Sequence, residues 1–422
     1  MSRSSLYICC ILLLTVALSS CNTSSKVEPR NDKFFVKFFD GRGIGGNQEG
    51  RDVIATSDGG YLLAGVDRED NGNTEFLVVK TDIMGNQLWK LAEFDSTQEI
   101  SGEAKSILEV TDGYIIGGTT MIGGIEHSVL LKLGLDGSRI DTALIYTDNN
   151  FNRLSKITSG NSGILISGET DHINSTAGGL NGFLRLYDES LNVIKVQSKD
   201  IWYFGLGGDD FVSGAFEVND PNLIGSDAIQ YLVFGHFDDV LNSDGFDFYY
   251  NGFDSNFTPA NSLTSNSFKR SGDQLNSDIV RFNNLFYMIG TTTANGSQLF
   301  LSVLAFDDKP VDDDWQFDDP RSGPIPTNTD IAGKSLVIPS PNKIILTGDI
   351  IFSNDHSEIY LGETNANKSV EWARTFGTLS QYKAGGITID ANGSIIVVGS
   401  ADLESQTKMI LIKTGPDGKM SL

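Results

Sequence analysis

The sequence predicts an all-β fold, a seven-bladed β-propeller of four-stranded antiparallel blades. Three observations lead to this prediction: a glycine-ended run of β-forming residues recurs, turn signals separate short strands, and helical periodicity is absent beyond the N-terminus. The recurring glycines are 50 to 67 residues apart, which suits one propeller blade per repeat. They are Gly65, Gly118, Gly168, Gly235, Gly290, Gly348 and Gly399.

The first repeat shows the order of elements within a blade. A β-rich segment, Asp52–Thr56, precedes an Asp-Gly turn, and the run Tyr61–Gly65 follows it. A third strand, Phe76–Thr81, comes after a polar loop, and a fourth strand follows a second turn. Asp-Gly and Asn-Gly turns provide the positive φ of tight hairpins. A glycine within a strand predicts a close backbone approach or a bulge.

The two ends of the chain are predicted to share one blade. A fourth strand ends in an aromatic residue in six repeats, and the seventh repeat stops after its third strand and turn. The segment Phe34–Phe39 near the N-terminus has the pattern of the missing strand. We expect it to pair with the C-terminal blade and close the ring, because closure removes an exposed sheet edge.

The N-terminus indicates export. Arg3 precedes an apolar segment, Leu6–Leu18, which is too short to span a membrane as a helix. The sequence Leu18-Ser19-Ser20-Cys21 resembles the lipobox of bacterial lipoproteins. This resemblance implies a signal peptide over residues 1–20 and a lipid (palmitate) on Cys21. The polar segment that follows predicts a tether over 21–32, and the repeats predict a propeller domain over 33–422. The lipobox resemblance favours the outer membrane, on either the periplasmic or the cell-surface side.

The repeat pattern itself resembles a known group. The segment Asp82-Ile-Met-Gly85-Asn86-Gln-Leu-Trp89, after an Asp-Gly-Gly-Tyr turn, is similar to the β-propeller repeats of exported Bacteroidetes-type proteins. The resemblance covers nearly the whole mature chain. It implies a fold and not an activity, because propellers serve as enzymes, lectins and scaffolds.

Charge and cysteine usage limit the functions. The formal net charge of −24 disfavours nucleic acid as a partner, because phosphates would be repelled. It also disfavours direct electrostatic attraction to an anionic membrane, so contact with the membrane is expected through the lipid on Cys21. Cys9 and Cys10 lie in the signal peptide, so no disulfide and no cysteine-based metal site is expected in the mature domain.

Several aromatic residues are ligand candidates. All four tryptophans precede a fourth-strand aromatic, and this placement favours packing between blades. Trp202, Tyr203 and Trp315 lie near irregular segments, and His236 lies beside a loop, so these four residues are the predicted ligand contacts. The four histidines are scattered over four repeats, and we expect them on solvated loops instead of around one metal ion.

Two acidic segments are candidates for Ca²⁺, the one cofactor considered. Carboxylate and amide oxygens are the ligands that Ca²⁺ prefers. The first segment contributes Asn242, Asp244 and Asp247, and the second contributes Asp312 and Asp314. Neither has the spacing of an EF-hand, and solvated turns are the alternative interpretation.

The predicted function is a binding or scaffold module of the cell envelope that presents loops to a protein or glycan, with the chain as a monomer. No serine-hydrolase, zinc-protease or phosphate-loop motif occurs, so no catalytic residue is assigned and an enzyme is the less favoured class. The alternative is a glycan hydrolase or lyase with carboxylates in the channel. Departures from the repeat at Asn219–Gln230, His236–Asp247 and Asp307–Asp319 are the expected places for function.

Overall fold

A computed structural model describes residues 33–420 with internal gaps. The gaps are residues 42–45, 71, 92–100, 146–149, 173–178, 206–207, 219–228, 239–244, 260–265, 269–271, 294–296, 306–314, 317–329, 353–355, 367–368, 379 and 404–405. The strands all belong to one compact unit, Phe34–Leu422. Between these gaps the chain forms strands and turns but no helix, so no membrane-spanning helix is found in the described part. The predicted signal peptide, Cys21 and the tether lie outside the described residues.

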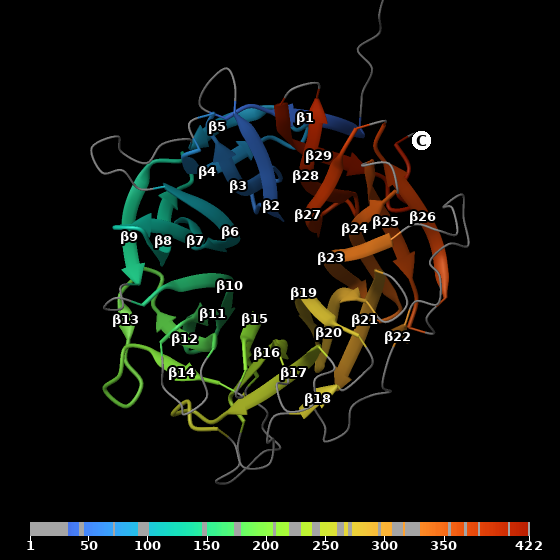
Figure 1. Cartoon of the computed structure of the whole chain (residues 1–422). Coiled ribbons are helices and arrows are strands. Elements are labelled where there is room, and N and C mark those ends of the chain that lie inside the picture. Colours follow the sequence, from blue (N-terminus) through green and yellow to red (C-terminus); the bar gives the residue numbers. More distant parts are fainter. Residues whose placement is uncertain are drawn as a thin grey trace, which may run out of the picture. The chain divides into compact units, whose positions relative to one another are not determined.

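The strands form seven antiparallel sheets, blades I to VII, around a ring (Figure 1). Blade I contains β2 (Asn47–Ala55), β3 (Tyr61–Arg68), β4 (Thr74–Thr81) and β5 (Gln87–Leu91). Blade II contains β6 (Ser101–Val110), β7 (Gly113–Ile122), β8 (Ile125–Gly134) and β9 (Arg139–Ile145). Blade III contains β10 (Asn152–Gly160), β11 (Gly163–Thr170), β12 (Asn181–Tyr187), β13 (Val193–Ile194) and β14 (Trp202–Phe204).

The next three blades repeat this order. Blade IV contains β15 (Asp210–Glu217), β16 (Tyr231–Asp238), β17 (Phe246–Phe253) and β18 (Asn266–Phe268). Blade V contains β19 (Gln274–Phe282), β20 (Leu285–Thr292), β21 (Gln298–Ala305) and β22 (Trp315–Gln316). Blade VI contains β23 (Asp330–Ser340), β24 (Lys343–Ile351), β25 (Ser357–Thr364) and β26 (Val370–Phe376).

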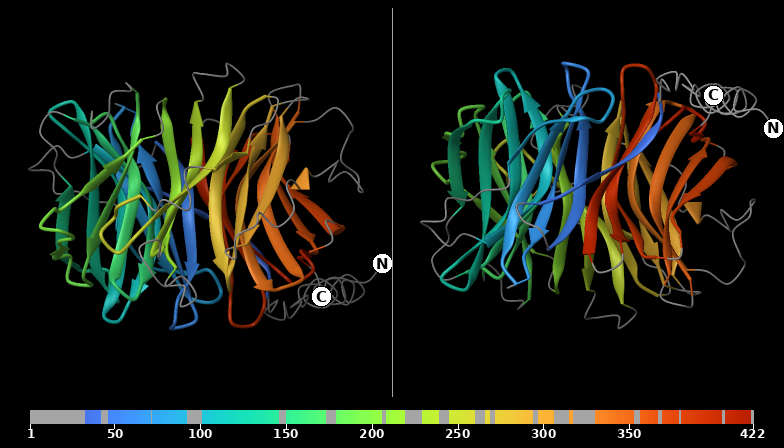
Figure 2. Two further views of the ribbon diagram at one scale, coloured as in Figure 1. Left: turned by 90° about the horizontal axis from the view of Figure 1, so that it is seen from below. Right: turned by 90° about the horizontal axis from the view of Figure 1, so that it is seen from above.

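Blade VII joins both ends of the domain. It contains β27 (Tyr382–Ile389), β28 (Ile395–Leu403) and β29 (Gln406–Thr414) from the C-terminal repeat, and β1 (Phe35–Phe39) as its outer strand. Strand β1 pairs antiparallel with β29, with Phe35 opposite Lys413. The predicted fold and its ring closure are therefore confirmed. In side view the strands run between the two faces of the ring (Figure 2).

The hydrophobic core is divided among the blade interfaces. Each of seven clusters combines buried side chains of two neighbouring blades. The cluster between blades VII and I, for example, brings Phe35, Leu411, Val53 and Leu77 together. A chain of this length therefore needs no single large core, because every blade buries both faces on its neighbours.

The notable turn residues of the first repeat have structural roles. The Asp82 carboxylate accepts hydrogen bonds from the backbone amides of Met84 (2.9 Å) and Asn86 (2.8 Å), which closes the turn. Trp89 packs on Gly137 in the corresponding turn of blade II, and its indole nitrogen donates to the carbonyl of Leu135 (3.1 Å). Trp89 thus stacks one blade on the next, as its place in the repeat predicts.

A buried polar contact fastens blade VII to blade I. The Lys413 ammonium lies 3.0 Å from the Asp390 carboxylate, and both side chains are only 4% exposed. The hydroxyl of Tyr61 in blade I donates to the same carboxylate at 2.9 Å. The charge pair lies within blade VII, and the Tyr61 hydroxyl links it to blade I, so the ring closure rests on this buried polar contact as well as on the β1–β29 ladder.

Candidate functional site

Every inner strand contains a β-bulge at the recurrent glycine of its blade. The register against the second strand shifts there in all seven blades. A Cβ added to Gly65 would lie 1.9 Å from the carbonyl oxygen of Glu49, and the corresponding distance in every blade is between 1.9 and 2.3 Å. The glycine is therefore required by the close approach of the bulged strand. This confirms the structural meaning predicted for the recurring glycine.

The bulges position a ring of residues at the centre of the molecule. Each bulge leaves one residue of the inner strand without a ladder partner, and blade VII leaves two adjacent glycines. All of these residues line one central cavity of about 130 Å³. From blade I to blade VII they are Arg51, Lys105, Ser155, Ser213, Ser277, Lys334, and Gly385 with Gly386. We call them the bulge ring.

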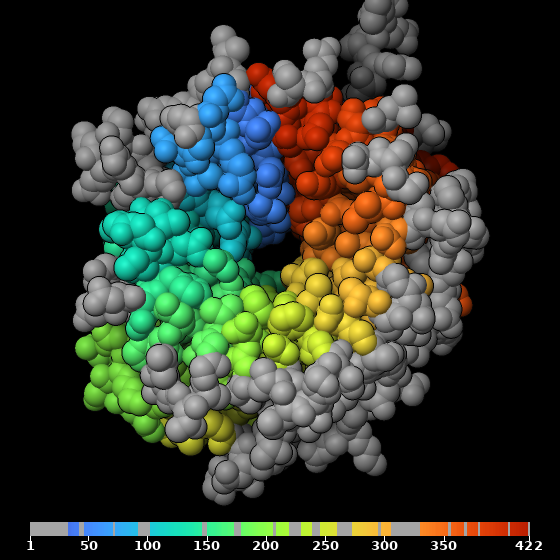
Figure 3. Space-filling view, in the orientation of Figure 1, coloured from blue at the N-terminus to red at the C-terminus, as the bar shows by residue number. Residues whose placement is uncertain are grey.

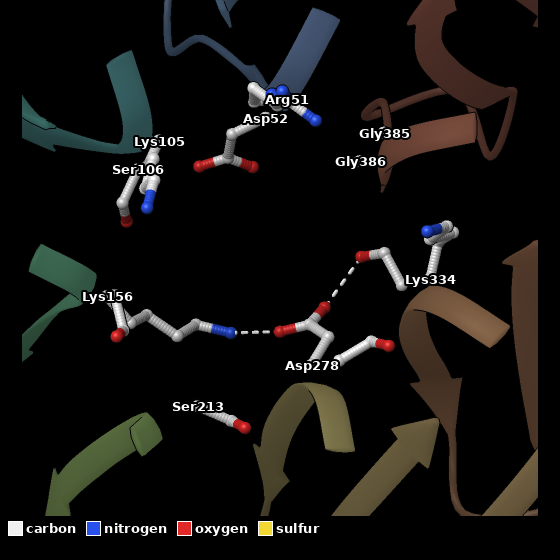
Figure 4. A pocket seen from close by; sticks show the side chains of 13 residues that line it. Arg51, Asp52, Lys105, Ser106, Lys156, Ser213, Asp278, Lys334, Gly385 and Gly386 are labelled. Atoms are coloured by element: carbon white, nitrogen blue, oxygen red, sulfur yellow. Dashed lines mark hydrogen bonds and ion pairs between the residues drawn. The ribbon is translucent and has the colours of Figure 1, made fainter. Parts of the chain in front are cut away.

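The cavity opens in the middle of the propeller. The space-filling view shows the hollow between the inner strands (Figure 3), and the lining side chains converge on it from around the ring (Figure 4). Residues that follow the bulges complete the wall, namely Asp52, Ser106, Lys156, Asp278 and Ser335. Of the described residues that line the cavity, none has an apolar side chain.

The bulge ring has two chemically different sides. Blades VI, I and II contribute the cations Lys334, Arg51 and Lys105, while blades III, IV and V contribute serines. Blade VII contributes only glycine, so no side chain separates Lys334 from Arg51. The cavity exists because the serine and glycine side chains are too small to fill the channel.

The cations of the ring share nearby carboxylates. Arg51 lies 2.7 Å from Glu49, while Glu103 lies 3.2 Å from Lys105 and 3.8 Å from Arg51. Arg68, outside the cavity, also contacts both glutamates, at 3.3 and 3.8 Å. The Arg51 side chain is 40% exposed. These are exchangeable, partly solvated ion pairs, which contribute little to stability.

Residues that follow the bulges connect neighbouring blades. The Asp52 carboxylate accepts from the backbone amides of Val53 (2.8 Å) and of Ile107 in blade II (2.8 Å). The Ser106 hydroxyl in turn accepts from the backbone amide of Ile157 in blade III (3.1 Å). One side of the channel wall is thus held together by side chains that occupy the same position in successive repeats.

The side chain of Lys156, in blade III, extends past blade IV to reach blade V. Its ammonium pairs with Asp278 in blade V (Figure 4) and donates to the carbonyl of Ile279 at 2.7 Å. The path is open because blade IV has Gly214 at this position, where an added Cβ would lie 3.1 Å from the Lys156 side chain. Asp278 also accepts from the Ser335 hydroxyl of blade VI at 2.6 Å. This pair therefore ties blades III, V and VI together on the side opposite Asp52.

Asp52 and Asp278 are the two carboxylates of the cavity lining. Burial raises the pKa of Asp52 to about 6, against the opposing effects of its bond from Ile107 and the charge of Lys156. Asp278, by contrast, is paired directly with the Lys156 ammonium. The two carboxyl groups therefore lie in different electrostatic surroundings within one cavity.

The predicted aromatic ligand contacts lie at separate places. Trp202 packs edge-on against Phe257 of blade IV at 5.9 Å between ring centroids. Tyr203 stacks on His172 at 4.2 Å, on the other side of the same strand. Trp315 is on β22, where its side chain is not among the described ones. Ligand contact at these residues stays a prediction, and none of them lines the central cavity.

His236 is a packed residue of blade IV. Its ring stacks on Phe211 at 4.9 Å, and its Nδ1 accepts from the backbone amide of Asn276 in blade V at 3.2 Å. Burial lowers the pKa of His236 to about 4. His127 is also buried, at 1% exposure. The expectation of solvated loops was wrong for these two histidines, because blade packing encloses them.

The predicted calcium ligands fall largely outside the described residues. Asn242, Asp244, Asp312 and Asp314 all lie in the gaps. Asp247 is described, and it is buried at 4% exposure on β17. Within the part of the chain that has coordinates to describe, no group of three His, Cys, Asp or Glu residues has metal-binding geometry. The calcium sites stay a prediction.

The bulge ring was not identified from the sequence, although a signal for it exists. In the first strands of the repeats a polar pair precedes the apolar residues, as in Arg51-Asp52, Lys105-Ser106 and Ser277-Asp278. The bulge-ring residue lies 13 or 14 residues before the recurring glycine in six repeats and 22 residues before it in blade IV, so the pairs form one column only when the turns are aligned with gaps. A column with polar residues on the innermost strand of a propeller indicates the channel wall.

Comparisons with known proteins support the fold. No known protein family and no curated protein matches the sequence. Similar solved structures include a puromycin hydrolase, with 10% identity over 83% of this chain and 50% of that chain and a TM-score of 0.50. The β-propeller domain of the Trilobed protease from Pyrococcus furiosus has 12% identity over 89% and 98% of the two chains, with a TM-score of 0.48. Phage phi92 endosialidase has 9% identity over 91% and 69%, with a TM-score of 0.44. These likenesses concern the fold alone.

Proposed function

We propose that the chain is a binding module of the cell envelope and that its ligand enters the central channel. The observation that carries this proposal is the bulge ring: six of the seven repeats direct polar side chains into one cavity, the seventh contributes only glycine, and every side chain of the lining is polar. A purely structural ring would gain stability by filling this space with apolar side chains, since burial of charged groups costs free energy. Polar groups that converge on a cavity can fix the orientation of a ligand, as the few polar groups of known ligand pockets do.

The test uses two matched substitutions on one strand. Ser155→Phe fills the cavity, whereas Ser159→Phe adds the same side chain at an exposed position of β10 outside it. Both variants and the wild type are assayed on an immobilised panel of polysaccharides and peptides. We expect a ligand that the wild type and Ser159→Phe bind and Ser155→Phe does not. Equal binding by all three, or binding of nothing, would contradict a ligand site in the channel.

A second variant shows whether a loss of binding by Ser155→Phe comes from the filled cavity or from misfolding. Ser277 lines the same cavity from blade V and is exposed, so Ser277→Phe can place its ring in the opening without displacing buried side chains. We expect it to lose the same ligand as Ser155→Phe while its unfolding midpoint stays that of the wild type.

The proposed location is the outer membrane, with the lipid on Cys21 as anchor. Support comes from the lipobox-like sequence before Cys21. In a bacterial host, metabolic labelling with an alkyne palmitate should mark the wild type and leave Cys21→Ser unlabelled and released from the membrane fraction. Labelling of the variant would argue against this anchor. Protease treatment of whole cells distinguishes the surface side from the periplasmic side.

An enzyme acting on glycans is the second candidate, and the two cavity carboxylates favour it. Asp52, with its pKa raised to about 6, could act as a proton donor, and Asp278, paired with Lys156, is the second carboxylate of the cavity. A hydrolase or lyase would release new chain ends from a bound glycan. Asp52→Asn should then abolish release while retaining binding. If the wild type binds a glycan and produces no new chain ends, the binding function is supported and the enzymatic function is contradicted.

A further inference from the structure

We infer that the central channel takes a carboxylate-bearing sugar residue, held by its carboxylate on the Arg51 side and by its hydroxyls on the serine side. This inference rests on the proposed function, which it narrows to one class of ligand. It follows from the division of the bulge ring into a cationic half and a hydroxyl half.

The cationic half provides the carboxylate site. Three cations, Lys334, Arg51 and Lys105, come from blades VI, I and II, and a guanidinium can bind a carboxylate through two parallel hydrogen bonds. Lys334 pairs with Asp349 at 3.5 Å, outside the cavity lining, whereas the fourth cation, Lys156, pairs with Asp278 within the lining. The carboxylate is therefore expected at the gap beside Gly385, between Lys334 and Arg51.

Arg51 can turn toward a ligand without leaving its glutamates unpaired. Glu49 lies 3.3 Å from Arg68, and Glu103 lies 3.2 Å from Lys105, so each keeps a cationic partner. The 40% exposure of Arg51 and of Lys334 keeps both side chains accessible from solvent. The cavity lining itself has four cations and two carboxylates. Because the protein as a whole carries a net charge of −24, these cations must attract an anionic ligand at short range, where salt screening is weak.

The hydroxyl half favours a sugar over a peptide. Ser155, Ser213 and Ser277 offer groups that both donate and accept, as ring hydroxyls require. The hydroxyls of Ser155 and Ser277 make no hydrogen bond to other described residues, and the Ser213 hydroxyl makes a long one, 3.2 Å to the carbonyl of Asn276. A peptide would bring apolar groups against a wall that has no apolar side chain to receive them.

The size of the cavity limits the ligand to a terminal residue. A volume of about 130 Å³ is below the roughly 300 Å³ at which ordinary ligand pockets begin, so we expect room for about one sugar residue. The bound residue is thus expected at the end of a chain or on a short branch, with the rest of the glycan outside the channel.

The test compares acidic and neutral trisaccharides by calorimetry. The probes end in galacturonate or in galactose, and acetate and inorganic phosphate serve as simple anions. We expect the acidic trisaccharide to bind about tenfold more tightly than the neutral one and than either simple anion. Arg51→Gln should remove this tenfold preference, so that the acidic and the neutral trisaccharide bind the variant equally. Arg139→Gln, on the outer strand β9, is the matched control and should behave like the wild type.

A second variant tests the direction of the effect. Glu103 competes for Arg51 and Lys105, so Glu103→Gln should raise the affinity for the acidic trisaccharide about threefold. A loss of folding cannot produce such a gain.

The outcomes separate this inference from the proposed function. Equal binding of the two trisaccharides, blocked by Ser155→Phe, would overturn the carboxylate site and keep the channel as a ligand site. Binding of a peptide with a free carboxylate, and of neither sugar, would overturn the sugar class alone. Acidic binding that survives both Arg51→Gln and Ser155→Phe would overturn the channel and the inference together.

Discussion

Replacing a recurrent glycine tests whether these residues are required by the bulges. A Cβ on Gly65 would fall 1.9 Å from the Glu49 carbonyl oxygen, whereas a normal contact between carbon and oxygen is about 3.3 Å. The inner strand would have to move by about 1.4 Å, and the opposing atom is backbone, which cannot rotate away. Strand propensity alone predicts the opposite sign, because alanine is favoured over glycine in a strand by about 0.5–1 kcal/mol. We expect Gly65→Ala to lower the unfolding free energy by about 3 kcal/mol.

The control is a glycine of the same blade with free space around it. Gly59 has φ of +88°, and an added Cβ would meet nothing within 4 Å. Gly59→Ala should therefore cost only the strain of a left-handed alanine, about 1 kcal/mol. Denaturant unfolding followed by tryptophan fluorescence measures both variants. A Gly65→Ala protein that is as stable as the wild type, or more so, would refute the steric origin of the repeat.

Three further predictions concern the ring and its pH dependence. Asp390→Ala leaves the buried Lys413 ammonium without its carboxylate, so denaturant unfolding should show a loss of about 3 kcal/mol, and no loss would contradict the seam between blades VII and I. Gly214→Ala puts a methyl group against the Lys156 side chain and should cost about 1 kcal/mol, with the lysine displaced from Asp278 in a crystal structure of the variant. The pKa of His236 is about 4 when folded and 6.5 unfolded, so stability should fall by up to about 3 kcal/mol as the pH drops through that window. His236→Gln keeps an acceptor without titrating, and an unchanged pH dependence of its unfolding would contradict this assignment.

The fold was predictable from the sequence because each blade repeats its own signals. The glycine of the second strand, the Asp-Gly turns and the apolar runs are local, and seven copies fix the number of blades. Ring closure was predictable too, since the seventh repeat lacks a strand and Phe34–Phe39 has the matching pattern. In the structure that strand is β1, Phe35–Phe39, paired with β29.

The candidate site was not predictable by the same reasoning. Attention to departures from the repeat led to Trp202, Tyr203 and His236, and the structure places these among packed aromatic neighbours. The channel residues sit within the repeat, at its bulge, and differ only in which polar side chain each blade provides. Recognising them requires knowing that the bulge turns this one position toward the axis, which is a property of the assembled sheet. The position of Lys156 beside Gly214 depends on how two neighbouring blades pack, and no feature of the local sequence predicts it.

The most direct test of the channel as a ligand site is a crystal structure of the protein soaked with the galacturonate-ended trisaccharide. The account predicts density for the terminal sugar inside the central cavity, with its carboxylate on Arg51 and its hydroxyls on the serines of blades III to V. Density for the sugar only at the outer edge or on a face of the ring, with the cavity holding water, would contradict it.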